Sequence, residues 1–234
     1  MNALTRRSGL SVLVGLASAL AATAASAQEK LVLFGGEIAD AAYYSYVGTV
    51  LPFGERKDGR GWFQRYWLDG YGYEYDGGPG RVKATAYGLE GALGYGGASR
   101  NGWWGVSLGL RYTDTSLSPD DPTATARGSQ AGGKFQVETE QRIGDAWRVG
   151  GIASYSNEQN AYWGRARVMH GPQARAFGVE AVAIGNDETD AVATGFVASF
   201  QPTGSKWSAA VKAGYRFQQD ADGAYGGLEV GYSF

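Results

Sequence analysis

The chain has 234 residues, with no Cys, a single His, 21 basic residues and 23 acidic residues. The absence of Cys excludes disulfides, and one His leaves too few ligands for a typical transition-metal site, so we expect no metal and no cofactor. The charges are nearly balanced and interspersed, which argues against a nucleic-acid partner.

The amino terminus has the pattern of a secretory signal peptide. Arg6 and Arg7 precede an uncharged apolar run that ends in Ala25-Ser26-Ala27. A basic head, an apolar middle and small residues before a cut are typical of export signals. The run is short and rich in Ala, whereas a spanning helix needs about 20 apolar residues. We expect residues 1–27 to be removed after Ala27 and residues 28–234 to form one exported domain.

The rest of the chain is dominated by an alternation of period two. Between 207 and 218, the apolar residues Trp207, Val211 and Tyr215 occupy one face and the polar residues Lys212 and Arg216 occupy the other. The same alternation recurs at 102–113, 133–142 and 224–234. Strands of about ten residues with one apolar and one polar face are typical of transmembrane β-barrels.

Turn residues divide the chain into twelve predicted strands. Their ranges are 30–39, 42–53, 61–75, 82–95, 102–113, 130–142, 147–157, 161–170, 174–184, 189–200, 207–218 and 224–234. The stretch from Gly54 to Arg60 is long for a periplasmic turn, which leaves ten and fourteen strands as alternatives. The longest predicted connection, from Asp114 to Gly128, should lie on the outer surface.

The predicted fold is an all-β, closed, antiparallel transmembrane barrel. A sheet in lipid must pair its last strand with its first, because hydrocarbon offers no partner to backbone groups. The last strand ends on Tyr232 and Phe234, which resembles the carboxy-terminal signal of outer-membrane barrels. A periplasmic β-sandwich or a lipocalin-like cup is the alternative. We expect a location in the outer membrane of a Gram-negative bacterium, in contact with its lipid.

Aromatic residues near strand ends should anchor the barrel at the two membrane interfaces. They include Trp104, Tyr112, Trp147, Tyr155, Trp207, Phe217 and Tyr232. The charged residues of the polar face should line a narrow lumen, which they either close or leave as a charged pathway. They are Glu90, Arg111, Lys134, Glu138, Glu140, Arg142, Arg165, Arg167, Glu180, Lys212, Arg216 and Glu229.

One face of the third predicted strand carries Arg65, Trp67, Asp69, Tyr71 and Tyr73. A face with Arg and Asp should point into the lumen, where the rings could stack on sugars while the charged groups hydrogen-bond hydroxyls. These five residues are our predicted glucan contacts. The alternative is that they fill and brace a narrow barrel.

Enzymatic activity has little support in the sequence. A serine hydrolase needs a base beside its nucleophile, and the only His, His170, lies beside Gly171-Pro172 at a predicted turn. We therefore predict no catalytic residues.

The first third of the chain resembles a known family. Tyr43-Tyr44-Ser45-Tyr46-Val47-Gly48, Asp58-Gly59-Arg60-Gly61-Trp62 and Gly70-Tyr71-Gly72-Tyr73-Glu74-Tyr75, within a stretch from about Phe34 to Tyr75, are similar to the bacterial cellulose biosynthesis protein BcsS family. The resemblance implies a small outer-membrane barrel of a cellulose secretion apparatus, with no catalytic residues to transfer. The expected function is a non-enzymatic accessory role in cellulose or exopolysaccharide secretion, with a glucan chain and other secretion components as partners. The alternatives are a small diffusion pore or structural barrel and, with less support, an outer-membrane hydrolase.

Overall fold

The computed structural model describes residues 30–40, 42–78, 80–185, 190–218 and 222–234. The predicted signal peptide lies outside these residues. No helix in the described ranges is long and apolar enough to cross a membrane.

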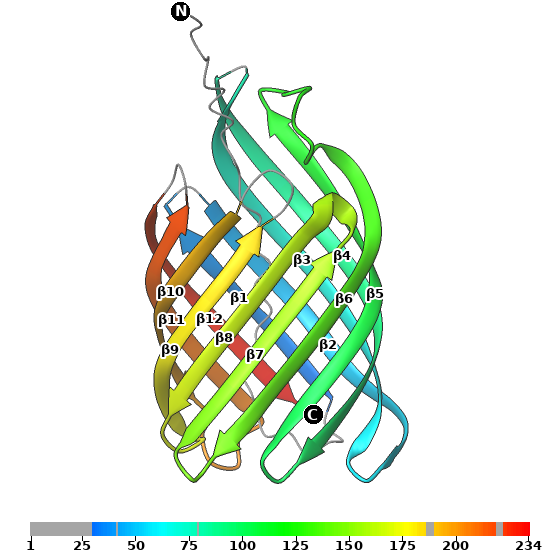
Figure 1. Cartoon of the computed structure of the whole chain (residues 1–234), viewed down its shortest axis with the longest axis vertical. Coiled ribbons are helices and arrows are strands. Elements are labelled where there is room, and N and C mark those ends of the chain that lie inside the picture. The colour runs from blue at the N-terminus through cyan, green and yellow to red at the C-terminus, as the bar shows by residue number, and fades with distance from the viewer. Residues whose placement is uncertain (1–29, 41, 79, 186–189, 219–221) are drawn as a thin grey trace, which may run out of the picture.

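Twelve antiparallel strands form a closed barrel in which each strand pairs with its sequence neighbours (Figure 1). They are β1 Leu31–Ala39, β2 Ala42–Lys57, β3 Arg60–Gly77, β4 Gly80–Ser99, β5 Gly102–Ser118, β6 Gly128–Ile143, β7 Trp147–Ser156, β8 Ala161–His170, β9 Arg175–Gly185, β10 Asp190–Phe200, β11 Trp207–Gln218 and β12 Gly223–Ser233; a 3-10 turn, η1, covers Glu158–Asn160. The predicted strand count and antiparallel closure are confirmed.

Pairing of β1 with β12 closes the barrel. The register runs from Leu31 opposite Ser233 to Ala39 opposite Tyr225. Beyond the strand ends, the Lys30 N–H donates to the Phe234 carbonyl at 3.2 Å and the Phe234 N–H donates to the Lys30 carbonyl at 2.9 Å. No sheet edge is left to face lipid, as the bilayer requires.

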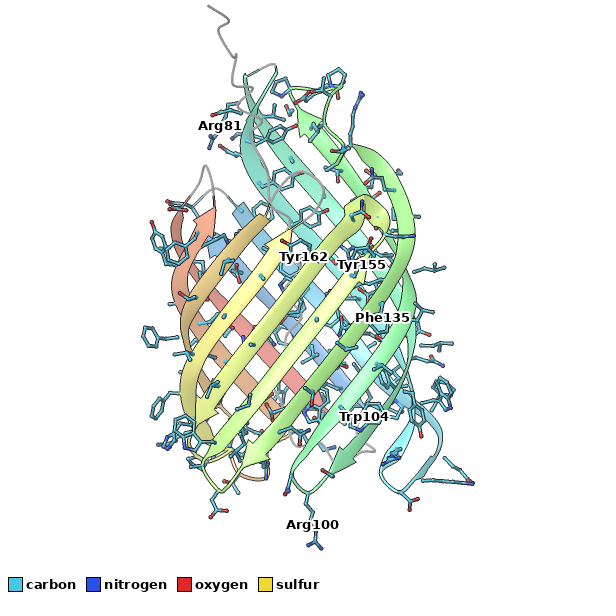
Figure 2. The ribbon with its side chains drawn as sticks, in the orientation of Figure 1. Arg81, Arg100, Trp104, Phe135, Tyr155 and Tyr162 are labelled. Atoms are coloured by element: carbon cyan, nitrogen blue, oxygen red, sulfur yellow. The ribbon has the colours of Figure 1, made fainter. Side chains whose placement is uncertain are left out.

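The wall has an apolar exterior at the level of the membrane. Leu108 and Leu110 of β5 point outward and are 68% and 73% exposed, whereas Ser107 and Arg111 of the same strand are buried in the interior. Figure 2 shows Trp104 low on the wall, Tyr155 and Tyr162 higher, and Phe135 between them. The predicted aromatic girdles therefore flank an apolar belt, as in membrane barrels.

The end of the barrel that holds Phe234 also holds the short turns between even and odd strands. The turn at Asp58 and Gly59 has φ angles of 52° and 74°, and positive φ at both positions is typical of a two-residue hairpin turn. Bacterial barrels place their termini and short turns in the periplasm, so we assign this end to the periplasm. The predicted long turn at Gly54 to Arg60 is wrong, because β2 continues through a bulge to Lys57.

Strands β3 to β6 rise beyond the others at the opposite, extracellular end (Figure 1). Here β5 runs to Ser118 and β6 begins at Gly128, so the connection covers only 119–127, where the sequence predicted Asp114 to Gly128. The end of β5 was predicted too early because Asp114 and Thr115, although they alternate between the outer and inner faces, are both polar. Above the lipid, β5 continues to pair with its neighbouring strands, but it has no apolar face by which the sequence would identify it as a strand.

The 119–127 connection is tied to β3 through Asp121. The Asp121 carboxylate accepts hydrogen bonds from the Thr123 hydroxyl at 2.7 Å, the Thr123 N–H at 3.1 Å and the Tyr75 hydroxyl at 3.4 Å. The two Thr123 bonds are the main cause that lowers the pKa of Asp121 below its ordinary value.

We predict that this connection loosens in acid. Because the folded-state pKa of Asp121 is depressed, its stabilising contribution is complete above the unfolded pKa of about 4 and is lost as the pH falls through the folded value. Protection of the Thr123 amide from hydrogen exchange, measured by NMR, should fall over that interval. Asp121→Asn should remove the pH dependence, and an unchanged pH profile in this variant would contradict the assignment.

We also predict that Leu108→Arg destabilises the barrel by about 2–4 kcal/mol, the cost of a cation on the lipid face near the midplane, because Leu108 lies midway between Trp104 and Tyr112 on the outer face of β5. Ser116→Arg is the matched control, because Ser116 lies on the same face of β5 above the belt. Denaturant unfolding in lipid vesicles measures both. Equal effects of the two substitutions would argue against the assigned belt.

Candidate functional site

The structure places all five predicted glucan contacts on the inner face of β3. Arg65, Trp67, Asp69, Tyr71 and Tyr73 are each no more than 6% exposed. Each is covered by neighbours from the inner wall, so the five form one continuous packed surface rather than an open groove.

Trp67 is held flat against the wall between a ring and a cation. Its ring lies 4.9 Å from that of Tyr46 with 14° between the planes, and the Arg65 guanidinium lies 4.8 Å from the ring centre. The indole N–H donates to the Tyr44 hydroxyl at 3.3 Å. Gly48 lies beneath, where an added Cβ would overlap the indole. The stacking of Tyr46 on Trp67 covers a face of the indole on which a sugar ring would otherwise stack.

Above Trp67, tyrosines continue the inner wall of β3 toward the extracellular end. The Tyr71 and Tyr73 rings are 6.3 Å apart and nearly parallel, and the Tyr73 and Tyr75 rings are 6.2 Å apart. Leu117 and Ala124, at and beyond the end of β5, pack against the buried cluster to which these tyrosines belong, and the Tyr75 hydroxyl donates to Asp121 of the connection. The 119–127 connection therefore helps to cover the tyrosines from outside.

A first set of ion pairs links β3 to β6 across the inner wall. Arg111 donates to both carboxylate oxygens of Asp69, at 2.8 and 2.9 Å. The pair passes over β4 at Gly88, where an added Cβ would collide with both side chains. Glu90 similarly lies 2.6 Å from Lys134 and 3.4 Å from Arg65. Paired geometry of this kind offsets the loss of hydration of buried charges.

A second set, which we call the Glu229 cluster, spans the lumen. Its members are Glu229, Arg165, Arg167, Glu180, Lys212, Glu37 and Arg216. Glu229 of β12 accepts from Arg165 at 2.9 Å and from two nitrogens of Arg167 at 2.8 Å, although both arginines lie four strands away on β8. Arg167 also lies 2.7 Å from Glu180. The cluster therefore ties opposite sides of the wall together.

The Glu229 cluster separates two small cavities. One lies toward the periplasm with a volume of about 50 Å³, and the other lies toward the extracellular end with a volume of about 20 Å³. Arg165 lines both. Cavities of this size hold a few water molecules, so the interior in this region is closed to a polymer.

The predicted lumen charges lie inside except at the periplasmic rim. Arg142 was predicted to line the lumen but is exposed there, where it donates to the Gln173 side chain at 2.6 Å. The alternation of inward and outward residues ends at this rim, where consecutive residues at the end of β6 are all exposed. His170 is also not a turn residue: it ends β8, and its ring lies 4.6 Å from Trp147 and 5.5 Å from Phe177.

Several interior residues were not singled out from the sequence. Glu37 joins Lys212 at 2.8 Å and also pairs with Arg216, and Arg148 is buried near the periplasmic mouth. Their alternation with the outward residues Ile38 and Trp147 is the signal that finds them. In the described ranges, no three His, Asp or Glu side chains come together as a metal site.

One serine motif was not recognised from the sequence: Gly105-Val106-Ser107-Leu108-Gly109 has the Gly-x-Ser-x-Gly spacing of a hydrolase elbow. A nucleophile elbow lies on a sharp turn between a strand and a helix. Ser107 instead lies within β5 and faces the interior, where it is buried. The spacing here is a consequence of strand alternation.

We predict that Glu229→Gln lowers the free energy of unfolding by about 3–5 kcal/mol, because it leaves buried cations without their shared partner. Glu55→Gln, at an exposed site of β2, is the control. Unfolding in lipid vesicles can be followed by Trp fluorescence. An unchanged midpoint for Glu229→Gln would show that the cluster does not stabilise the barrel.

Solved structures of similar fold are outer-membrane barrels. An outer-membrane channel of Pseudomonas putida F1 has a TM-score of 0.59 at 12% identity, covering 88% of this chain and 94% of that one. The β domain of the Bordetella autotransporter BrkA has a TM-score of 0.55 at 13% identity, covering 88% and 98%. The translocator domain of the autotransporter NalP of Neisseria meningitidis has a TM-score of 0.51 at 13% identity, covering 88% of each chain. At these identities the likeness concerns the fold.

No curated protein sequence matches the chain. The family model for the cellulose biosynthesis protein BcsS matches residues 32–234, well beyond the stretch from Phe34 to Tyr75 that carries the resemblance in the sequence. The chain therefore belongs to the BcsS family and is a Gram-negative outer-membrane β-barrel associated with cellulose biosynthesis.

Proposed function

We propose that this chain is a non-enzymatic accessory barrel of a cellulose or related exopolysaccharide secretion system. The observation that carries the proposal is the Glu229 cluster, which closes the lumen with ion pairs between β8 and β12. A glucan chain cannot thread past Arg165 and Arg167 while these pairs are intact. The barrel is then not the channel through which the polymer passes. It acts next to that channel, with the other secretion components and membrane lipid as its partners.

The surroundings of Ser107 and His170 support a non-enzymatic role. Ser107 belongs to the interior of β5, whereas His170 packs between Trp147 and Phe177 in the outer aromatic girdle. The two residues therefore face opposite sides of the wall, and a Ser-His pair requires hydrogen-bond contact.

Glucan contact by the inner face of β3 is part of the proposal. Arg65 and Asp69 supply charged hydrogen-bonding groups, and Trp67, Tyr71 and Tyr73 supply rings for stacking. Because Trp67 is stacked on Tyr46, contact requires that stack to open. Calorimetry with cello-oligosaccharides on the folded chain, with Trp67→Ala and Tyr71→Ala, tests this assignment. Binding that is unaltered in both variants would place the glucan elsewhere.

A small diffusion pore is the second candidate, favoured by the two cavities that lie on either side of one layer of ion pairs. Planar-bilayer recordings separate the candidates. A closed accessory barrel should conduct poorly, and Glu229→Gln should raise its conductance. A wild-type chain that conducts ions freely would favour the pore.

The accessory role predicts that deleting the gene lowers the amount of cellulose secreted, measured as acid-insoluble glucose, while leaving the cellulose synthase level unchanged. Re-expression of the wild-type chain should restore the polymer. Ser116→Asn is a suitable control variant, since Ser116 lies on the exposed extension of β5. Undiminished cellulose in the deletion strain would overturn the proposal.

A further inference from the structure

The periplasmic cavity combines buried polar groups that lack hydrogen-bond partners with an opening at the periplasmic end of the barrel. It is lined by inward residues from the periplasmic ends of β5 to β8, β10 and β11, and it reaches Gln173 and Gln201 in the periplasmic turns. Lining by turn residues means that the cavity reaches the periplasmic mouth. We call it the periplasmic pocket.

Two buried side chains in the periplasmic pocket are unpaired. Arg148 is 8% exposed, and its Nε has no hydrogen-bond partner among the described residues. Ser208, 7% exposed, has an unpartnered hydroxyl. Both line the pocket. A buried donor without a partner is destabilising by about 1–3 kcal/mol, so two such groups around one cavity indicate a site that a polar ligand or water completes.

Glu140 supplies an acceptor in the same pocket. It lines the cavity with Arg148, and within the described part of the chain it forms no ion pair within 4.0 Å and no hydrogen bond. The pocket therefore presents a guanidinium and a carboxylate that attract each other but form no ion pair within 4.0 Å. An anionic ligand would meet Glu140, and a cationic ligand would meet Arg148. A neutral polyol suits both, because each hydroxyl accepts from one group and donates to another.

Part of the remaining lining of the pocket is apolar. Met169, Val197 and Ala210 are buried and pack together, and the half-buried Trp103 stands opposite Glu140 in the pairing of β5 with β6. All four line the cavity. A pyranose ring combines hydroxyls at its edge with C–H groups on its faces, which matches a site that has polar groups and an apolar floor.

The inner limit of the pocket is the Glu229 cluster. Arg165 and Arg167 line its deep end, and their guanidinium groups are engaged with Glu229. The enclosed volume of about 50 Å³ holds only a few water molecules, so a terminal sugar ring would displace that water and rest in the open mouth of the pocket, and it could not continue through the barrel. We propose that the periplasmic pocket binds the terminal sugar ring of a neutral glucan through Arg148, Glu140 and Ser208. The choice of a glucan rests on the proposed role in cellulose secretion.

Calorimetric titration with cellotetraose, on the full folded chain in detergent, tests the site. Arg148→Met and Glu140→Gln should each weaken binding by about tenfold or more, the effect of losing a hydrogen bond to a charged group. Ser208→Ala, a small change with little risk to folding, should weaken it by a few fold. Arg81→Met and Glu74→Gln, at the exposed extracellular end, should bind like the wild type. Heat-modifiable gel mobility verifies that each variant is folded.

Three results would overturn the site. These are no binding of cellotetraose to the folded wild type, binding that survives in both Arg148→Met and Glu140→Gln, or tighter binding of an oligoglucuronate of equal length. Loss of binding in Trp67→Ala alone would place the ring on the β3 face instead. Failure here is separable from failure of the proposed function, because the deletion strain reports on cellulose secretion independently of where a glucan binds.

Discussion

The structure depends on one constraint, the inability of hydrocarbon to hydrogen-bond a polypeptide backbone. The wall meets it by pairing β1 with β12, so that the sheet has no edge within the membrane. Once the sheet is closed, every position in a strand faces either lipid or the interior. Each inward charge must then find its partner among the other inward residues, since the narrow lumen holds little water.

The arrangement of ion pairs follows from that enclosure. Asp69 reaches Arg111 over one intervening strand, and Glu229 reaches Arg165 and Arg167 across the lumen. Pairs of this second kind brace the barrel and divide its interior. The contrast with Arg148 and Glu140 is informative, because these two form no ion pair within 4.0 Å in a barrel whose deeply buried charges are largely matched. Their position at the periplasmic mouth is where a ligand from the cell envelope arrives first.

The aromatic residues serve two different purposes. Outward rings such as Trp104 and Tyr155 mark the membrane interfaces, whereas inward rings such as Trp67 and Tyr71 form a packed wall on β2 and β3. That inner wall coincides with the segment from Tyr43 to Tyr75 that carries the resemblance to the BcsS family. The family's most recognisable residues therefore build one side of the lumen, and the Gly48 position makes room for its central indole.

The sequence by itself determined the strand count, the closure and the face of nearly every strand residue, because alternation of period two is a local property of extended chains in contact with lipid. It also assigned Arg65 and Glu90 to the interior. It did not identify the outer end of β5, which runs to Ser118, because polar residues such as Asp114 and Thr115 lie on both of its faces. Only the tertiary structure decided which inward residues meet. Whether Glu229 contacts Arg165, or Arg148 remains unpaired, depends on how strands distant in sequence are brought around the lumen, and barrel closure fixes those distances.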